Sequence, residues 1–501
     1  MLRLTVPRVS PTIPDMLRFA AATFEIFPKS ALSSGTLWSQ PLVGVFAPLK
    51  SSLFLIEEES NLIAILTSNF ITDYNHVSLL LRKFIGEELG VPLSQVFCFS
   101  SHNHSATQLN AKVHRTFTTP NPDDLTPEEE LTDDGMELLR LSVEHARTLR
   151  DRLEPSEVRY GIGQERRITH NRKGRRADGS TYMMREEDRL LLGEDFNGDI
   201  DADAFVVGFF KEDRALGFLT QFTGHPVTAF HCDSPLVCAE YPQVACDDLS
   251  RKFGNVPAGF LQGCAGDVNA KGLLSDLPPG KRVLRAEGYG HQLGETFLKI
   301  AGNLKKSERA GLKWLWRSVR LPYKEVPPVA ELELRIQGVK EFLVRCENGD
   351  ELGTRVCDGL NFSRSMKVSS RANLVQPTMD WLKWALAFHE ENRLEAAPKS
   401  LDIDIAVIRI GDVGIVGLPG EPVLGIGRKI KSGAPLPFTI PCGYMNEGQD
   451  SFAYIPDGPN CEDLDYCSSF YRYTLHMLPF RPPAGDALAE AAEQMLKKIL
   501  P

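Results

Sequence analysis

The stretch that decides the fold is residues 61–105, NLIAILTSNFITDYNHVSLLLRKFIGEELGVPLSQVFCFSSHNHS. Apolar residues run almost unbroken from 61 to 70, which predicts a buried strand. From 74 to 89 they recur at helical spacing, and Gly90 is a typical helix stop. A second apolar run, 95–100, predicts another strand. The stretch is therefore a β–α–β unit, which gives two parallel strands.

Polar residues follow the second strand of this unit, as Ser101-His102-Asn103-His104-Ser105. In α/β sheets, sites gather at the carboxyl ends of the strands. If the chain bends here, His102 can bind a metal ion while His104 faces a substrate. The alternative for this motif is a pair of polar loop histidines.

The same alternation of strands and helices continues along the chain. Helices are expected at about 133–153, 241–253, 283–304, 328–346, 372–391 and 485–500, and strands at about 204–210, 217–224 and 258–262. Residues 401–416 are expected to form two strands that turn at Gly411–Asp412. The polar tract 165–203 is expected to be a long surface loop. We therefore predict an α/β fold, one large domain over 1–501, in which helices flank mixed sheets and the site lies at strand ends.

Composition limits the classes of function. The net charge of −10 argues against a general nucleic-acid binder, which needs an excess of positive charge. No stretch is long and apolar enough for a membrane span, and prolines interrupt the N-terminal residues where a secretion signal would be apolar. Ten cysteines without a CxxC pair are typical of reduced thiols. We expect a cytoplasmic protein, and the oligomeric state is left open.

Three further motifs carry candidate site residues. His225 follows a predicted strand within Gly224-His225-Pro226; it is either a metal ligand or a satisfied buried histidine. Glu421 stands in Pro419-Gly420-Glu421, at the start of a predicted helix. A carboxylate there is commonly an electrostatic cap, but it is equally able to be an oxygen ligand for zinc. Tyrosines recur between 443 and 473, where they either pack or assist a metal site.

Two other segments have less specific patterns. The glycines of Gln262-Gly263-Cys264-Ala265-Gly266-Asp267 indicate close backbone approach, but the spacing is not that of a phosphate loop. A basic cluster between 166 and 176 is typical of a solvated loop; it comprises Arg166, Arg167, Arg172, Lys173, Arg175 and Arg176.

Taken in order, these segments resemble the neutral/alkaline, non-lysosomal ceramidase family. The resemblance covers most of the chain. Ala22–Pro28 is similar to the family's DITP-like turn, Ser101–Thr107 to its THTHSGP motif and Asn171–Lys173 to its NRR segment. The pair His225–Val227 and Ala239–Gln243 is similar to HPT with ADFPG, and Phe260–Asn269 to FLQGAAGDxNP. Pro419–Glu421 is similar to PGE, and Asn446–Pro456 to NxYxxYxP.

The resemblance implies a site and a cofactor. Carried over by motif, the zinc ligands are His102, His225, Glu421 and Tyr454, while His104 transfers protons and Tyr466 contacts the reacting amide. The implied activity is zinc-dependent hydrolysis of a linear amide, on a ceramide-like lipid or a smaller N-acylated amine. The family's extracellular members carry a secretion signal and a C-terminal β domain; neither is expected here, which favours an intracellular substrate over ceramide.

Three alternatives to this function stay open. An esterase or other zinc hydrolase on the same scaffold is the nearest. A catalytically inactive binding protein is the second, because a fold does not fix a function. A nucleic-acid-binding role is the third, and the acidic net charge opposes it.

Overall fold

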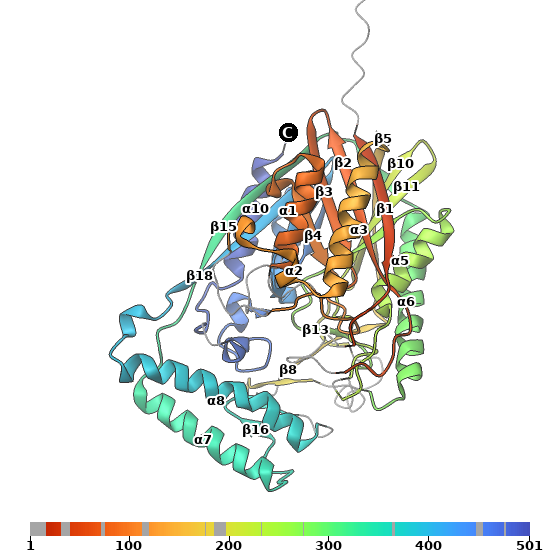
Figure 1. Ribbon diagram of the computed structural model, residues 1–501. Helices are drawn as coiled ribbons and strands as arrows, with labels where there is room; N and C mark the ends of the chain where they lie inside the picture. The colour runs from red at the N-terminus through yellow and green to blue at the C-terminus, as the bar shows by residue number, and fades with distance from the viewer. Residues whose placement is uncertain are drawn as a thin grey trace, which may run out of the picture.

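Three β-sheets with helices on their outer faces make up the body of the protein (Figure 1). The computed structural model describes residues 17–31, 41–71, 76–112, 120–175, 177–184, 197–231, 233–273, 275–362, 366–446, 454–474 and 477–500. The α/β prediction with mixed sheets and flanking helices is confirmed.

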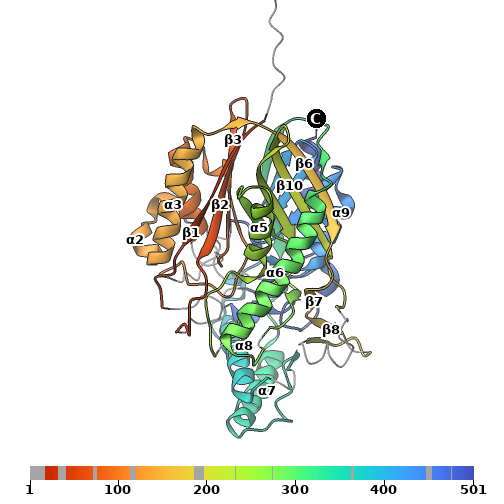
Figure 2. The same cartoon turned by 90° about the vertical axis from the view of Figure 1, so that its right-hand side faces the viewer.

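The first sheet contains the β–α–β unit expected from the sequence. Its elements are β1 (Arg18–Ile26), β2 (Leu49–Glu58), β3 (Asn61–Ser68), α1 (Val77–Leu89), β4 (Val96–Ser100) and β5 (Glu154–Pro155). The strand order is β4-β3-β2-β1-β5, and only the β3–β4 pair is parallel. Helix α1 and helix α3 (Asp133–Arg150) cover its outer face (Figures 1 and 2). The short helix α2 (Pro127–Glu130) directly precedes α3.

The second sheet repeats this arrangement. It is built from β6 (Glu157–Gln164), β10 (Asp203–Lys211), β11 (Arg214–Phe222), α5 (Glu240–Lys252), β12 (Ala258–Gln262) and β14 (Lys305–Lys306). The order is β12-β11-β10-β6-β14, with β11 and β12 parallel. Helices α5 and α6 (Pro279–Ala301) pack on its outer face.

The third sheet has the same topology again. It contains β15 (Leu312–Pro322), β18 (Ser400–Ile410), β19 (Val413–Gly417), α9 (Leu424–Gly433) and β21 (Phe438–Cys442), in the order β15-β18-β19-β21. Strands β19 and β21 are parallel, and α10 (Asp486–Lys498) lies beside α9. Each sheet thus has three antiparallel strands, a crossover helix and a parallel fourth strand, followed later in the chain by an outer helix.

The inner faces of the three sheets share one apolar core. It includes Phe54 and Phe97 from the first sheet, Phe209 from the second and Ile408 and Phe438 from the third, all buried. Because this core removes apolar surface of all three sheets from water, it fixes how the sheets lie relative to one another. The strand-end loops of all three sheets then meet at one place.

Short strands and a helical hairpin complete the structure. The short strands are β7 (Thr169–Asn171), β8 (Lys173–Arg175), β9 (Thr181–Met183), β13 (Val268–Ala270), β16 (Val356–Cys357), β17 (Leu360–Asn361), β20 (Glu421–Pro422) and β22 (Tyr454–Ile455). Helices α7 (Val329–Glu347) and α8 (Val368–Glu390) form a hairpin that projects from the body (Figure 1).

The polar tract 165–203 differs from the surface loop expected for it. Its described part contains β7, β8 and β9, and Thr169 to Arg172 are buried. Residues 185–196 lie outside the described residues. The solvated-loop interpretation of the basic cluster is therefore wrong for Arg172, because this side chain is only 5% exposed; Arg176 lies outside the described residues.

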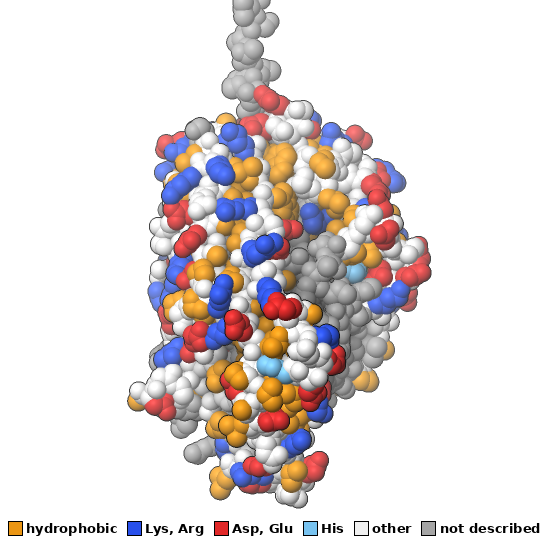
Figure 3. Space-filling view, turned by 90° about the vertical axis from the view of Figure 1, so that its left-hand side faces the viewer, with side chains coloured by type: hydrophobic (Ala, Val, Ile, Leu, Met, Phe, Trp, Pro, Cys, Tyr) orange, Lys and Arg blue, Asp and Glu red, His pale blue; other side chains and the backbone are white. Residues whose placement is uncertain are grey.

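The surface charge is mixed on one face (Figure 3), and the described helices are not membrane spans. On the face shown in Figure 3, basic and acidic side chains are interspersed rather than gathered by sign. Among the described residues, no helix is both long enough and apolar enough to cross a bilayer.

Candidate metal centre

The loop after β4 brings two histidine rings together. His102 has a left-handed backbone, with φ of 61°, and its N–H donates to Ser100 Oγ at 2.9 Å. This bend, required for both histidines to serve one site, places the ring centres of His102 and His104 4.7 Å apart. A non-glycine residue with positive φ costs conformational energy, so the surrounding contacts must hold it there.

His225, which follows β11, has a fixed ring orientation. Its Nδ1 lies 2.8 Å from the carbonyl oxygen of Ala265 and 3.2 Å from that of Val268. Carbonyl oxygens only accept, so Nδ1 carries the hydrogen and Nε2 presents its lone pair. Burial, with Arg172 and His102 nearby, lowers the pKa of His225 well below its usual value. A neutral imidazole with a free Nε2 is the form that binds metals.

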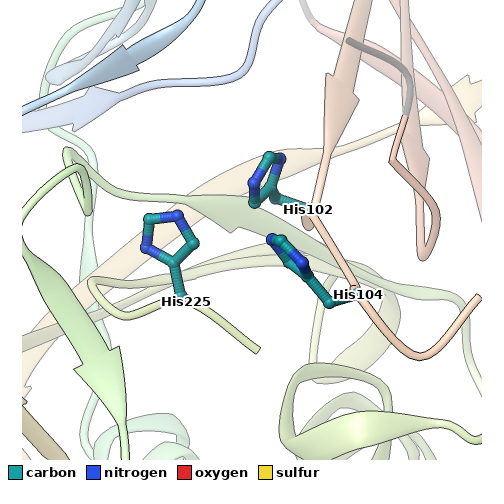
Figure 4. Close-up of side chains that lie close together, drawn as sticks. All are labelled: His102, His104 and His225. Atoms are coloured by element: carbon teal, nitrogen blue, oxygen red, sulfur yellow. The ribbon is translucent and has the colours of Figure 1, made fainter. Parts of the chain in front are cut away.

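The three histidines gather around one space, and Glu421 lies against two of them. One ring nitrogen from each of His102, His104 and His225 lies within 4.8 Å of the others, and the rings face a common space (Figure 4). Glu421 Oε2 lies 2.6 Å from His225 Nε2 and 3.6 Å from His102 Nε2. Imidazole nitrogens and a carboxylate oxygen are ligands for a divalent cation such as zinc. The histidine cluster could therefore hold a metal ion.

The atoms that would ligate a metal suit a cation for a second reason. With Nδ1 protonated and the ring neutral, Nε2 of His225 is an acceptor, and so is a carboxylate oxygen of Glu421. Two buried acceptors 2.6 Å apart repel each other unless a positive charge or a proton lies with them. A metal ion would relieve this repulsion.

Tyr454 lies beside this centre, and Tyr466 lies next to Tyr454. Tyr454 pairs in register with Glu421 between β22 and β20, and its ring stacks on His225 with centres 6.3 Å apart. Burial raises the pKa of the Tyr454 phenol well above its usual value, although Arg172 acts in the opposite direction. The Tyr466 ring centre is 5.5 Å from that of Tyr454.

Arg172 and Tyr444 belong to the centre, although motif analysis gave them no role. Arg172 donates to the Tyr454 hydroxyl at 2.6 Å and to the Gly266 carbonyl, and its guanidinium lies over the rings of Tyr454 and Tyr466. Tyr444 is fully buried, with its ring centre 4.6 Å from that of His102 and its hydroxyl 3.4 Å from His225 Nε2. Their sequence signals were only the similarity to NRR and a place among the late tyrosines.

Gln262 ties the two histidine loops to each other. Its Nε2 donates to the carbonyls of Ser101 and Gly224 at 3.0 and 2.9 Å, and its Oε1 accepts from the Gly224 amide at 3.2 Å. The glycines after Gln262 allow the close approach expected from the sequence. A Cβ at Gly266 would come within 2.5 Å of the Glu421 carbonyl oxygen, so only glycine fits there without movement.

Comparison with known proteins identifies the fold. Two solved structures are similar over 97% of this chain at 17% sequence identity. One is a neutral ceramidase from Pseudomonas aeruginosa, of which 75% is covered, with a TM-score of 0.60. The other is a ceramidase complexed with C2, of which 76% is covered, with a TM-score of 0.62. No family model matches the sequence, and comparison of the sequence with curated proteins found no match. The chain thus has a neutral ceramidase-like fold.

The structure brings all six residues of the sequence prediction to one region. His102, His104 and His225 lie together, Glu421 lies against His102 and His225, and Tyr454 and Tyr466 extend the site along one side. The geometry alone allows His104 as a third histidine ligand as well as a proton carrier, so the division of roles stays a prediction.

Proposed function

We propose that the protein is a zinc-dependent hydrolase that cleaves the amide bond of an N-acylated amine to a carboxylic acid and an amine. The observation that carries the proposal is the pair of buried acceptors, His225 Nε2 and Glu421 Oε2, at 2.6 Å. The fold shared with proteins described as ceramidases supports the amide bond as the target.

The proposed zinc ligands are His102, His225, Glu421 and Tyr454. The two histidines offer ring nitrogens and Glu421 offers a carboxylate oxygen, all in buried positions. When bound, zinc polarises a carbonyl group and lowers the pKa of water. The carbonyls of Ala265 and Val268 hold the His225 ring in the tautomer that binds.

His104 is the proposed proton carrier. Its ring is next to His102 but less buried than the other two histidines, which suits a group that faces a substrate. It would take a proton from the attacking water and deliver one to the leaving amine. Phe230 lies edge-on to this ring, with centres 5.3 Å apart, and limits its movement.

Tyr466 is proposed to donate a hydrogen bond to the developing oxyanion. Burial raises the pKa of its phenol well above the usual value, so the hydroxyl keeps its proton at neutral pH. Arg172, which lies against both Tyr454 and Tyr466, would hold the two rings in place.

The proposed substrate has an accessible amide and is a soluble or lipid N-acyl amine inside the cell, rather than ceramide of an outer membrane leaflet. The cytoplasmic location stays a prediction from the sequence. An assay of short-chain fluorescent ceramide, long-chain ceramide in detergent and small N-acyl amino acids, run side by side, tests the substrate. Turnover of long-chain ceramide with none of the soluble amides would overturn this preference.

Metal analysis of the purified protein, paired with this assay, tests the activity. We expect one tightly held zinc per chain and turnover that a chelator abolishes and zinc restores. Matched esters separate an esterase from an amidase. Bound zinc without turnover of any amide or ester would favour a binding protein and contradict the proposal.

A further inference from the structure

Two loops that carry histidines meet at one buried carboxylate at the start of α5, outside the metal centre. Glu240 Oε1 accepts the Ala229 amide at 2.6 Å, and Ala229 belongs to the loop that follows His225. The same oxygen accepts the Ser105 hydroxyl at 3.4 Å, and Ser105 directly follows His104. Glu240 is 1% exposed, so these contacts are shielded from water.

Ala229 is held at its carbonyl group as well as at its amide. Its carbonyl accepts from Arg282 Nη1 at 2.7 Å, and Arg282, on α6, is fully buried. The same guanidinium donates to the Ser234 carbonyl at 2.8 Å, further along the loop. Side chains on two helices therefore fix one residue, Ala229, through both its N–H and its C=O. A hydrogen bond from a charged group such as the Arg282 guanidinium is the stronger kind.

The peptide between Ala229 and Phe230 determines where Phe230 lies, and the Phe230 ring contacts the His104 ring. The two rings meet edge-on, at 67° with centres 5.3 Å apart. The His104 amide also donates to the Pro226 carbonyl at 3.3 Å, so the two loops are joined directly. A shift of the Ala229 peptide would move the surface against which the His104 ring rests.

The backbone around Glu240 is held in an unusual conformation. Glu240 has φ of 49°, in the left-handed region. The preceding Cys238 donates its amide to the Ser105 carbonyl at 3.0 Å and accepts from Asn103 Nδ2 at 3.0 Å. Strained non-glycine residues persist where contacts on several sides determine them, and they concentrate at functional sites.

We propose that Glu240 is a positioning residue that sets the place of the His104 ring through Ala229 and Phe230. This inference rests on the proposed function in one respect, because it takes His104 as the proton carrier. Glu240 itself touches no reacting group.

The test compares Glu240→Ala with Glu240→Gln. The alanine removes both contacts, whereas the glutamine keeps an oxygen for the Ala229 amide. Because burial raises the pKa of Glu240 to about 7, the glutamine also resembles its protonated form. We expect Glu240→Ala to lower kcat on the order of ten- to a hundredfold, since misplacement by ~1 Å has that scale of effect. KM and zinc content should stay near wild type, and Glu240→Gln should keep most of the kcat.

The matched control is Glu165→Ala. Glu165 is also buried in the second sheet's unit, and its carboxylate also accepts one backbone amide, from Arg167, and one hydroxyl, from Thr296. It pairs with the Arg167 guanidinium in addition, so its loss should cost at least as much stability. A purely structural loss should lower the stability of both alanine variants but leave the kcat of Glu165→Ala unchanged. Equal kcat losses in the two variants, or an unchanged kcat in Glu240→Ala, would overturn the proposal.

A readout that does not depend on turnover separates this inference from the proposed function. In protein labelled with ¹⁵N at histidine, we expect Glu240→Ala to move the ring signals of His104 and leave those of His225 in place. Phe230→Leu, which keeps an apolar side chain but removes the ring contact, should move the same signals even if Glu240→Ala fails to fold. Unmoved His104 signals in the folded variants would refute the positioning role. Moved signals in a protein without amide turnover would refute only the proposed function.

Discussion

The histidine side and the tyrosine side of the centre are built in different ways. The histidine side, His102, His104 and His225, follows on buried strands. The Ser100 hydroxyl holds the backbone turn at His102, and a backbone carbonyl fixes the His225 ring. The tyrosine side, Tyr444, Tyr454 and Tyr466, comes from the long connection after β21. There a side chain, Arg172 from the second sheet's unit, holds the phenol of Tyr454.

This difference predicts different consequences for substitution. Contacts at the strand ends pre-organise the histidine side before any metal binds, so it should determine whether metal is held at all. The tyrosine side depends on side-chain contacts between distant segments, so it should adjust affinity and rate. The following variants test this division.

The largest effect is expected for His102→Ala and His225→Ala. Each removes a nitrogen ligand, and the second also leaves Glu421 without its 2.6 Å neighbour. We expect severe loss of zinc by metal analysis and no measurable turnover in either variant. The control is His291→Ala, because His291 is exposed on α6 and pairs with Asp248. Full zinc occupancy in both ligand variants would remove the proposed site.

His104→Ala is expected to keep zinc and lose most turnover. The loss should be on the order of a hundredfold or more, which is typical of removing a general acid–base group. Zinc content and kcat measured on the same preparation decide the role. If zinc is lost, His104 is the third histidine ligand, which its nitrogen's position within the 4.8 Å cluster permits. An unchanged rate would make it a bystander.

The paired substitutions Tyr454→Phe and Tyr466→Phe probe the tyrosine side. Tyr454→Phe should weaken zinc binding by about tenfold or more, the scale seen when groups around a metal are removed. Tyr466→Phe should lower turnover with zinc retained. Competition with a chelator measures the zinc affinity of Tyr454→Phe, and steady-state kinetics measures the turnover of Tyr466→Phe. Tyr160→Phe, in the second sheet, is the control. The reverse pattern would mean that the two roles are exchanged.

Tyr444→Phe should have the smallest effect. Its hydroxyl lies 3.4 Å from His225 Nε2, which is long for a hydrogen bond, while the ring that packs on His102 is kept. We expect unchanged zinc content and a kcat close to wild type. A loss as large as that of His104→Ala would show that Tyr444, rather than Tyr466, is the tyrosine that contacts the reacting group.

Local pattern predicted the elements and the histidine side well. The β3–α1–β4 unit, the β10–β11 hairpin and most helices were expected from apolar periodicity, within a few residues at their ends. His102, His104 and His225 were expected at strand ends for the same reason. By contrast, β15 was not expected, and Arg172 was placed in a solvated loop. A basic run has no local feature that separates an exposed arginine from one buried against two tyrosines.

The sequence by itself determined most of the strands and helices, and it supplied a histidine or carboxylate at the end of several of them, because these depend on periodicity and on neighbours along the chain. Only the tertiary structure decided that the three sheets repeat one topology around a shared core, which brings their strand-end loops together. It also decided the 2.6 Å contact between His225 and Glu421 and the joint hold of Glu240 and Arg282 on Ala229. These pairings join residues far apart in sequence, and their geometry follows from packing of the whole core, which no local pattern encodes.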